Sequence, residues 1–374
     1  MKSNLPEVEK RIIVKESRSE FIQNYDEDNL YPQRTRDYIR SSGTAQSCVN
    51  LYAKFIRGKG LADPNFYKTK INSKGLTVDQ LHRKLTNSKA NHGGFSFHVN
   101  YNILGDIVNI NPVNFEFCRF GDDKYPEYTG KIAVYDDWER IKRRNIDKEL
   151  VKWYNFYNPE TVLEEIEQVG GIENYQGQIF YFSPLFGEYP LAPCDAVIED
   201  IITDAGIKDF RMRQVTTQFL GSHIIEYPYE FQSKKEREEE IENWSQFQGA
   251  PNANKMVIVE NANADKSGIK IHKLDLQNND KLFELTNRTC KDSIIESFGQ
   301  PPQLLGVSVA GKLGTADEIR DAYDFYNSYT EDDRIQMEEV YRDVFSRWST
   351  NINPSGNYSI IPLSFGTTNN NIGL

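Results

Sequence analysis

One lysine of this chain lies in a glycine-spaced segment of a kind that can bind phosphate. Residues 306–313 read GVSVAGKL, which fits the phosphate-binding pattern G-x-x-x-x-G-K up to Lys312. The pattern continues with Ser or Thr, whose hydroxyl binds magnesium, but this chain has Leu313. Pro301 and Pro302 lie where a buried strand should lead into such a loop. The segment therefore predicts a flexible glycine loop with a single cation, and ATP binding is the less favoured alternative.

Other residues that often carry chemistry are scattered along the chain. Adjacent carboxylates at 122–123 and 136–137 would point to opposite faces of a strand, so they indicate solvated turns rather than a cation site. The cysteines have no C-x-x-C spacing, which predicts buried free thiols in a reducing compartment. No histidine pair has metal-binding spacing, and we expect His92 and His98 to be structural. The sequence therefore predicts no catalytic residue, no metal site and no cofactor. The scattered residues are His82, His92, His98, His223, His272, Cys48, Cys118, Cys194 and Cys290.

Composition sets the class of protein. A chain of 374 residues suggests two or three domains, or one elaborated domain, with a substantial core. The formal net charge of −11 argues against a surface built to grip nucleic acid by neutralising phosphates. The N-terminus lacks the apolar core of a signal peptide, and no apolar run is long enough to span a membrane. We therefore expect a globular protein, made in a cytoplasm, with no membrane partner.

Two helical patterns flank the glycine loop. The first covers residues 280–297, with apolar positions such as Leu285 near one face, and the prolines end it. The second covers residues 317–348 without proline or glycine and carries an apolar stripe. Its opposite face is acidic, because ten Asp and Glu against four Arg leave a net of −6. The acidic face includes Asp317, Asp321, Asp324 and Glu331.

The N-terminal half combines helices with a mostly antiparallel sheet. Residues 1–28 read as a polar arm of uncertain order. Helical spacing covers residues 38–56, and a second helix follows over 77–88 with Thr77 as its N-cap. Strict alternation over 95–101 predicts a half-buried strand that turns at 102–106 into a partner. The further pieces are the partner strand from 107, strands at 115–120, 131–135 and 178–182, and a short helix at 161–168.

The central part of the chain predicts a small module carried on two helices. Helical spacing runs over residues 195–220, and the pattern then changes to strands separated by a charged helix over 234–248. The run KKEREEEIE at 234–242 is most simply a solvated helix face with i,i+4 ion pairs, and a partner-docking surface is the alternative. The strand-like pieces are 221–230, 256–260 and 268–274.

The order of these segments resembles the portal proteins of tailed bacteriophages, which also occur in gene-transfer particles. The resemblance rests on FGQPPQLLG at 298–306 with the glycine loop and long helix after it, SPL at 183–185 before a long helix, and GGFSFHV from Gly93. It covers roughly residues 29–348, and the order of the motifs is more specific than any one of them.

The resemblance implies an α+β portal fold with eight parts. Only 26 residues follow the long helix, so a helical crown is small or missing. The implied parts are an N-terminal arm (1–28), wing (29–193), first stem helix (194–220), clip (221–279), second stem helix (280–300), tunnel loop (301–315), long kinked helix (316–348) and short crown or tail (349–374).

The resemblance also implies a non-enzymatic ring, usually of twelve copies, at one capsid vertex of the virion, assembled in the bacterial cytoplasm. Double-stranded DNA would pass through it during packaging and ejection. Terminase and the head–tail adaptor would meet the clip, and the major capsid protein and scaffold would meet the wing. The alternatives are a packaging ATPase or nuclease, and a neck or baseplate ring protein. The implied loop residues are Val307, Ser308, Gly311, Lys312 and Gly314, and the implied motor-docking residues are Lys234, Lys235, Arg237 and Glu238.

Overall fold

The computed structural model describes residues 21–139, 150–185, 187–217, 223–229, 231–245, 257–260, 269–273, 280–306 and 315–366. The chain divides into two compact units, and each is described by itself. Unit 1 comprises Met1–Ile198 and Ile294–Leu374, and unit 2 comprises Glu199–Ser293. Helices and sheets occur in both units, so the expected α+β class is confirmed.

Unit 1 begins with a group of helices. The sequence predicted one helix over 38–56, but the structure has α1 (Tyr31–Ser41) and α2 (Gly43–Arg57), separated at Ser42. The helix breaks there because Ser42 has an extended backbone and its side chain accepts a hydrogen bond from the amide of Ala45. The short helix α3 (Pro64–Lys68) was not predicted. Helix α4 (Val78–His92) starts with the expected cap at Thr77, in a complete capping box.

A six-stranded sheet forms the second layer of unit 1, in the order β2-β1-β6-β5-β4-β3. The predicted hairpin is confirmed as β1 (Phe95–Tyr101) and β2 (Ile107–Val113), paired in antiparallel register. The expected strand over 115–120 is partly wrong, because Phe115–Phe117 is the 3₁₀ turn η1. The β5–β6 pair is parallel, unlike the other strand pairs of this sheet. The remaining elements are β3 (Cys118–Phe120), β4 (Lys131–Val134), the unpredicted β5 (Lys152–Phe156), α5 (Val162–Gln168) and β6 (Gln178–Phe182).

Residues 21–28, which were predicted as part of a polar arm, are attached to the sheet of unit 1. Phe21, Ile22 and Tyr25 are buried, and Ile22 forms an antiparallel bridge with Gly121 beside β3. The fully buried guanidinium of Arg119 donates hydrogen bonds to the backbone and side-chain oxygens of Asn29. These contacts fix the segment from Phe21 onward to the edge of the sheet.

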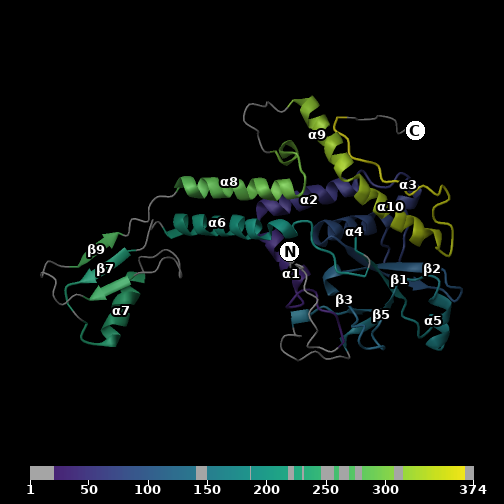
Figure 1. Cartoon of the computed structure of the whole chain (residues 1–374), viewed down its shortest axis with the longest axis horizontal. Coiled ribbons are helices and arrows are strands. Elements are labelled where there is room, and N and C mark those ends of the chain that lie inside the picture. The colour runs from purple at the N-terminus through teal and green to yellow at the C-terminus, as the bar shows by residue number, and fades with distance from the viewer. Residues whose placement is uncertain are drawn as a thin grey trace, which may run out of the picture. The chain divides into compact units, whose positions relative to one another are not determined.

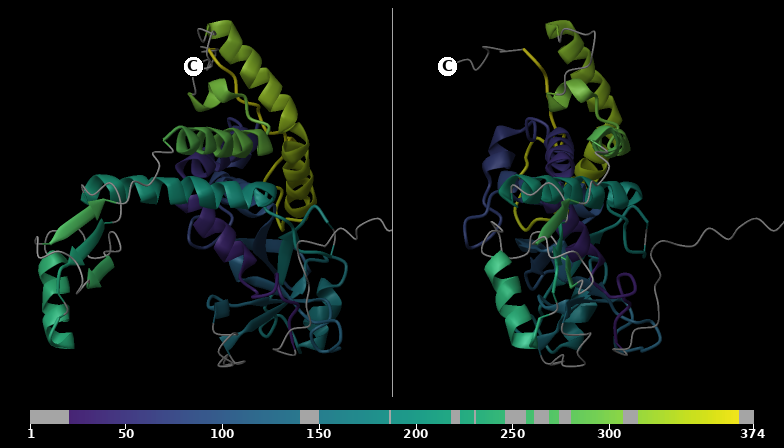
Figure 2. Two further views of the ribbon diagram at one scale, coloured as in Figure 1. Left: turned by 60° about the vertical axis from the view of Figure 1, so that its left-hand side comes forward. Right: turned by 90° about the vertical axis from the view of Figure 1, so that its left-hand side faces the viewer.

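Helices cover one face of this sheet (Figures 1 and 2). Alternate side chains of β1 enter the same core as apolar side chains of α4 and of the C-terminal helix α10 (Glu331–Ser346). His82 lies inside this core, where its Nδ1 is 2.7 Å from the hydroxyl of Tyr341 and its Nε2 is 3.0 Å from the carbonyl of Arg57. Burial lowers the pKa of His82 to about 4, so its imidazole is neutral near pH 7.

The long helix expected over 317–348 is two helices. The structure has α9 (Ala316–Tyr329) and α10, which meet at Thr330 with a visible bend in Figure 2. The continuous apolar stripe by itself predicted one uninterrupted helix. Helical spacing does not show where a side chain takes a backbone hydrogen bond and the helix bends. Residues after α10 return along unit 1, where Tyr358 packs on Phe66 and Ile360 bridges to Leu61.

Unit 2 contains two helices and a small module. Its helices are α6 (Ile198–Thr217), which the turn η4 (Asp195–Val197) precedes, and α8 (Asp280–Ser297), whose predicted bounds agree closely. They lie side by side, with the rings of Phe210 and Phe283 stacked at 5.1 Å. The module has the predicted strands and helix, with strand order β8-β7-β9. Its elements are β7 (His223–Tyr227), α7 (Lys234–Ser245), β8 (Val257–Glu260) and β9 (Lys270–Lys273).

Candidate functional site

The five predicted loop residues, Val307, Ser308, Gly311, Lys312 and Gly314, lie outside the described residues, but both flanks of the loop are described. On one side the turn η5 (Pro302–Leu305) ends at Gly306. On the other side Thr315 caps α9, where its hydroxyl accepts from the amide of Glu318 at 3.3 Å. The Glu318 carboxylate accepts from the amide of Thr315 at 3.2 Å, which completes a capping box. The residues on both sides of the predicted loop therefore have a defined backbone.

Gln300 anchors the first flank. Its buried side-chain amide donates to the carbonyl of Cys48 at 2.7 Å and to the hydroxyl of Tyr326 at 3.0 Å. Tyr326 in turn donates to the carbonyl of Phe298 at 3.2 Å. Residues 298–300 are thus tied to both α2 and α9. Sequence reasoning missed Gln300 because a glutamine beside two prolines carries no signal of burial.

Gly299 fits beneath α9 only because it has no side chain. Its φ is +59°, and a Cβ there would lie 2.6 Å from Cε2 of Tyr329. The glycine of FGQPPQLLG is therefore a packing requirement. It lets the ring of Tyr329 contact the backbone directly.

Arg334 stabilises the bend between α9 and α10. Its guanidinium donates to the carbonyl of Asn327 at 2.6 Å, to the hydroxyl of Thr330 at 2.7 Å and to the carbonyl of Phe55 at 3.3 Å. The last turn of a helix leaves carbonyls without helical partners, and here an arginine side chain takes one of them. The sequence placed Arg334 among the charges of the second helical pattern, but it is buried.

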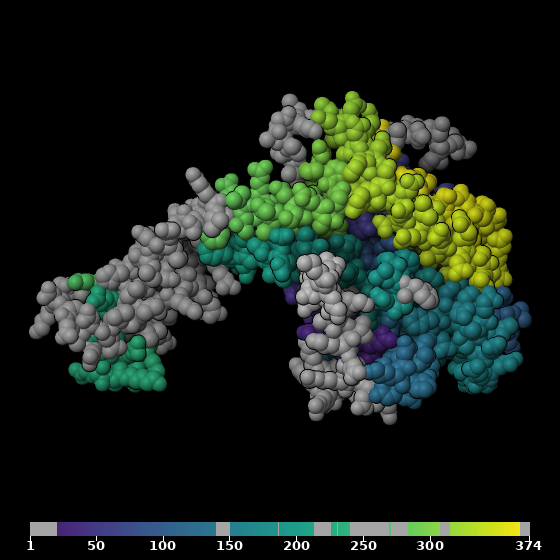
Figure 3. All heavy atoms as spheres, viewed as in Figure 1, coloured from purple at the N-terminus to yellow at the C-terminus, as the bar shows by residue number. Residues whose placement is uncertain are grey.

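The predicted acidic residues are all exposed. Spacings of four and three residues place Asp317, Asp321 and Asp324 along one stripe of α9, and Glu331 is the first residue of α10, just beyond the bend. Asp317 pairs with Arg320 at 2.6 Å. Among the described residues the other three carboxylates have no ion-pair partner. We call these four residues the acidic stripe. Figure 3 shows that α9 projects from the body of unit 1, so most of the stripe is open to solvent.

Two aromatic side chains accompany the acidic stripe. Phe325 and Tyr329 are half exposed or more on α9, although the predicted apolar stripe did not include either. Helical spacing places them beside the stripe, one turn apart. The surface of α9 is therefore acidic and aromatic.

The predicted docking residues of the clip lie on α7 in unit 2. Nζ of Lys234 lies 3.9 Å from Oε1 of Glu238, and Nζ of Lys235 lies 3.7 Å from Oε1 of Glu239. These distances confirm the expected i,i+4 ion pairs. Arg237 lies on the same exposed helix. The structure thus shows a solvated charged helix, and docking remains a prediction.

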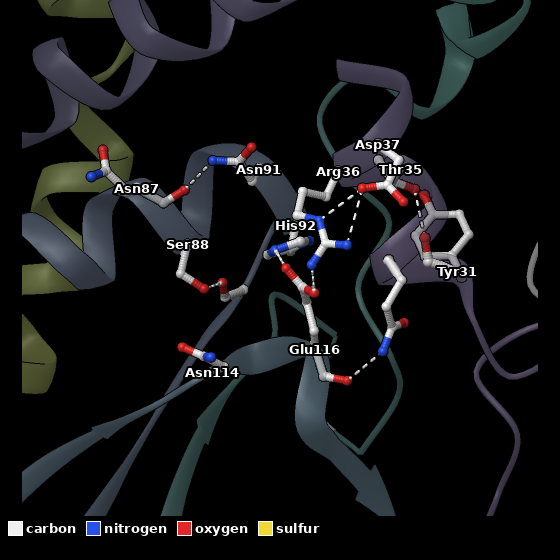
Figure 4. Close-up of polar contacts among 12 residues, drawn as sticks. Tyr31, Thr35, Arg36, Asp37, Asn87, Ser88, Asn91, His92, Asn114 and Glu116 are labelled. Atoms are coloured by element: carbon white, nitrogen blue, oxygen red, sulfur yellow. Dashed lines mark hydrogen bonds and ion pairs between the residues drawn. The ribbon is translucent and has the colours of Figure 1, made fainter. Parts of the chain in front are cut away.

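A polar cluster in unit 1 brings a histidine close to a carboxylate (Figure 4). Nε2 of His92 lies 3.6 Å from Oε1 of Glu116, and the guanidinium of Arg36 pairs with the same carboxylate. The ring of His92 also stacks on Phe115 at 5.6 Å. The hydroxyl of Ser88 donates to the carbonyl of Gly94 at 2.9 Å and therefore does not point at the histidine as a nucleophile would. The cluster joins α1, α4 and η1.

Within the described part of the chain, no three His, Cys, Asp or Glu side chains gather closely enough to hold a metal ion. No described helix is both long and apolar enough to cross a membrane.

No protein-family profile and no curated protein matches this chain. Several solved structures resemble it. A chain of the virion of a native gene transfer agent particle has a TM-score of 0.46 at 14% identity, over 79% of this chain and 76% of that chain. A chain from the neck of a native gene transfer agent particle, computed with C12 symmetry, has a TM-score of 0.44 at 14% identity, over 78% and 75%. An HK97 family phage portal protein from Corynebacterium diphtheriae has a TM-score of 0.42 at 9% identity, over 76% and 83%.

The chain is thus similar in its motifs to phage portal proteins, and one of the solved structures that resemble it is a phage portal protein.

Proposed function

We propose that this chain is a portal protein whose copies form a ring around a channel for double-stranded DNA. The observation that carries the proposal is the arrangement around residues 307–314. A glycine-spaced segment with one lysine follows an anchored turn and precedes a helix whose exposed face is acidic. The family resemblance supports the same reading, because it assigns this loop and helix to the channel.

The acidic stripe is suited to a conduit. The second helical pattern carries a net charge of −6, so twelve copies would bring about −72 to the ring. A wall of that sign repels phosphate and keeps DNA from adhering. In this proposal the acidic stripe faces the bore, and Lys312 with its glycine loop touches the passing DNA.

The helix pair of unit 2 supports assembly into a ring. Met212 and Leu285 are each 63% exposed, and Ile202, Phe210 and Phe283 are also exposed. Exposed apolar side chains gathered on one helix pair mark an interaction surface. In a ring they would pack against the neighbouring copy.

The outer surfaces would meet the other proteins of the particle. The clip helix α7, with Lys234, Lys235, Arg237 and Glu238, would meet the packaging motor and later the head–tail adaptor. The wing would meet the major capsid protein and scaffold. The ring would occupy one capsid vertex after assembly in the bacterial cytoplasm.

The ATP-binding alternative is less favoured. A phosphate-binding loop of the G-x-x-x-x-G-K type follows a buried strand, whereas η5 is a 3₁₀ turn. A nucleotide-binding role for Lys312 therefore lacks the element that would position it. A neck or baseplate ring protein is the remaining alternative, and particles without such a protein would still contain packaged DNA.

Deleting residues 307–315 tests the assignment of the loop. We expect rings of normal size, seen by electron microscopy, because the contacts of Gln300 with α2 and α9 remain, together with particles that retain or package less DNA. A matched deletion in the clip, residues 261–268, should instead leave DNA retention in completed particles unchanged. Loss of rings on deleting 307–315 would contradict the assignment, and ATP hydrolysis that disappears in Lys312→Ala would favour the enzyme.

A further inference from the structure

An apolar patch lies at the tip of the β1–β2 hairpin. Ile103 and Leu104 at the turn are 69% and 73% exposed, and Leu163 on α5 is 53% exposed. The hairpin and α5 meet here, because a Cβ on Gly105 would lie 3.3 Å from Cδ2 of Leu163. Figure 1 places both elements at the same end of the sheet. We call Ile103, Leu104 and Leu163 the hairpin-tip patch, and no part of the proposed channel uses it.

Acidic side chains lie beside Leu163 of the hairpin-tip patch on α5. Residues 158–178 contain five glutamates and no lysine or arginine. Glu164 and Glu167 lie exposed on α5, and within the described residues neither has an ion-pair partner. The nearby cation Arg347 is already engaged by Glu160 at 3.3 Å and Asp343 at 3.4 Å. A partner for this surface must therefore combine apolar side chains with positive charge.

One segment of this chain has that composition. Residues 10–15 read KRIIVK, so three cations flank three β-branched apolar residues. They precede Phe21, where the described structure begins. We propose that residues 10–15 of one copy dock on the hairpin-tip patch of a second copy. Ile12, Ile13 and Val14 would contact the three apolar side chains, and the cations would face the glutamates.

The register of the sheet determines how far the segment must reach. Residues paired across neighbouring strands form one row from β1 to the N-terminal segment. Along this row, Ile22 is five interstrand spacings from Val99. At about 4.8 Å per strand, with about 3.3 Å for each residue along a strand, Phe21 lies roughly 29 Å from the hairpin tip. The row is Val99, Gln178, Asn155, Lys131, Gly121 and Ile22.

The same copy's segment cannot easily span this distance. Eight residues separate Phe21 from Ile13, and a fully extended chain of that length spans about 26–29 Å. Antiparallel pairing of Ile22 with Gly121 also means that the described chain, followed back from Ile22 to Phe21, points away from the tip. For a contact within one copy, the residues between Ile13 and Phe21 would have to be fully extended toward the hairpin tip. A second copy is therefore the occupant that the geometry favours, and this rests on the proposed ring.

Cross-linking in the intact full-length assembly tests the proposal. Chains with only Ile13→Cys are mixed with chains with only Leu104→Cys, assembled, and treated with a short bismaleimide. The native cysteines Cys48, Cys118, Cys194 and Cys290 are buried. We expect a covalent dimer on a denaturing gel, and chains carrying both substitutions should give a ladder of higher multimers.

The matched control pairs Ile13→Cys with Leu185→Cys, since Leu185 is similarly exposed at 54% but follows the far end of β6. Reversing the charges at Lys10, Arg11 and Lys15 to Glu should lower the Leu104 cross-link roughly fivefold. A purely intramolecular product, or a yield no higher than the control in assemblies that electron microscopy shows to be rings, would overturn the proposal. Absence of rings from the unsubstituted chain would instead contradict the proposed function.

Discussion

Buried polar side chains organise unit 1, whereas exposed apolar side chains mark the helix pair of unit 2. Unit 1 buries polar and charged groups, such as Gln300 and Arg334, and gives them partners within the same chain. Unit 2 leaves apolar groups such as Met212 and Leu285 exposed on its helix pair. In unit 1 most buried polar groups have a partner within the same copy, although Oε1 of Gln300 has none among the described residues and the hairpin-tip patch is exposed. Unit 2 exposes groups that water disfavours, which is the pattern of a surface awaiting a partner.

The largest effect is expected from a charge in the helix pair of unit 2. Leu285→Asp should abolish ring formation while leaving each chain folded, because the side chain is exposed in one copy and each interface would bury an unpaired carboxylate. Leu150→Asp is the matched control, since Leu150 is 55% exposed in unit 1. Light scattering of both variants separates the outcomes. Intact rings for Leu285→Asp would remove the contrast between the units.

The next largest effect is expected at the bend of unit 1. Arg334→Met keeps the length of the side chain but removes three charged hydrogen bonds, and should lower the free energy of unfolding by about 3 kcal/mol. Arg342→Met, on the exposed face of α10, should change it by less than about 0.5 kcal/mol. Denaturant titration of both variants measures the difference. Equal stabilities would mean that Arg334 does not hold the bend.

The buried imidazole of His82 makes unit 1 sensitive to acid. Its pKa is about 4 when folded and about 6.5 when unfolded, so only the unfolded state takes up a proton between these values. Stability is therefore full above pH 6.5 and falls as pH falls toward 4. Between pH 7 and 4.5 the unsubstituted protein should lose about 2–3 kcal/mol more than His82→Gln, measured by urea unfolding. Parallel pH profiles would argue against a buried neutral histidine.

A smaller effect distinguishes two glycines that flank the prolines. Gly306 has a φ of +71° with open space around it, so Gly306→Ala should cost about 1 kcal/mol from backbone conformation alone. Gly299→Ala adds a clash with Tyr329 and should cost at least about 1 kcal/mol more. Thermal unfolding compares them. A smaller loss at Gly299 would show that α9 moves away freely.

The smallest effect on stability is expected from the acidic stripe. Asp321→Asn with Asp324→Asn should change unfolding by less than about 0.5 kcal/mol, because both carboxylates are exposed without ion-pair partners among the described residues. The same change should strengthen binding of double-stranded DNA at low salt, measured by fluorescence anisotropy. Glu127→Gln with Glu188→Gln alters as much charge elsewhere on unit 1. Equal DNA binding by the two double variants would argue against a channel-facing stripe.

Sequence periodicity predicted the elements that local patterns specify. The alternation in β1, the Thr77 cap and the charged helix α7 all follow from neighbouring residues. The break at Ser42 was missed, and the kink that the resemblance implied within 316–348 was not located at Thr330, because both depend on which side chain takes a backbone hydrogen bond. The burial of Gln300 and Arg334 was equally hidden, since their partners Cys48 and Phe55 lie far away in the sequence.

For Leu285 the sequence indicated burial, and the structure shows an exposed side chain. Helical spacing placed it near an apolar face, but it is exposed in a single copy. A sequence records every surface that a protein buries, including those that it buries against other copies. The exposed helix pair therefore supports the proposed assembly.

Negative-stain electron microscopy of the purified full-length chain is the most direct test of the central claim. We expect closed rings with a stain-filled central hole, and end-on class averages give the copy number. Compact single copies at micromolar concentration, with no symmetric assembly, would contradict the account.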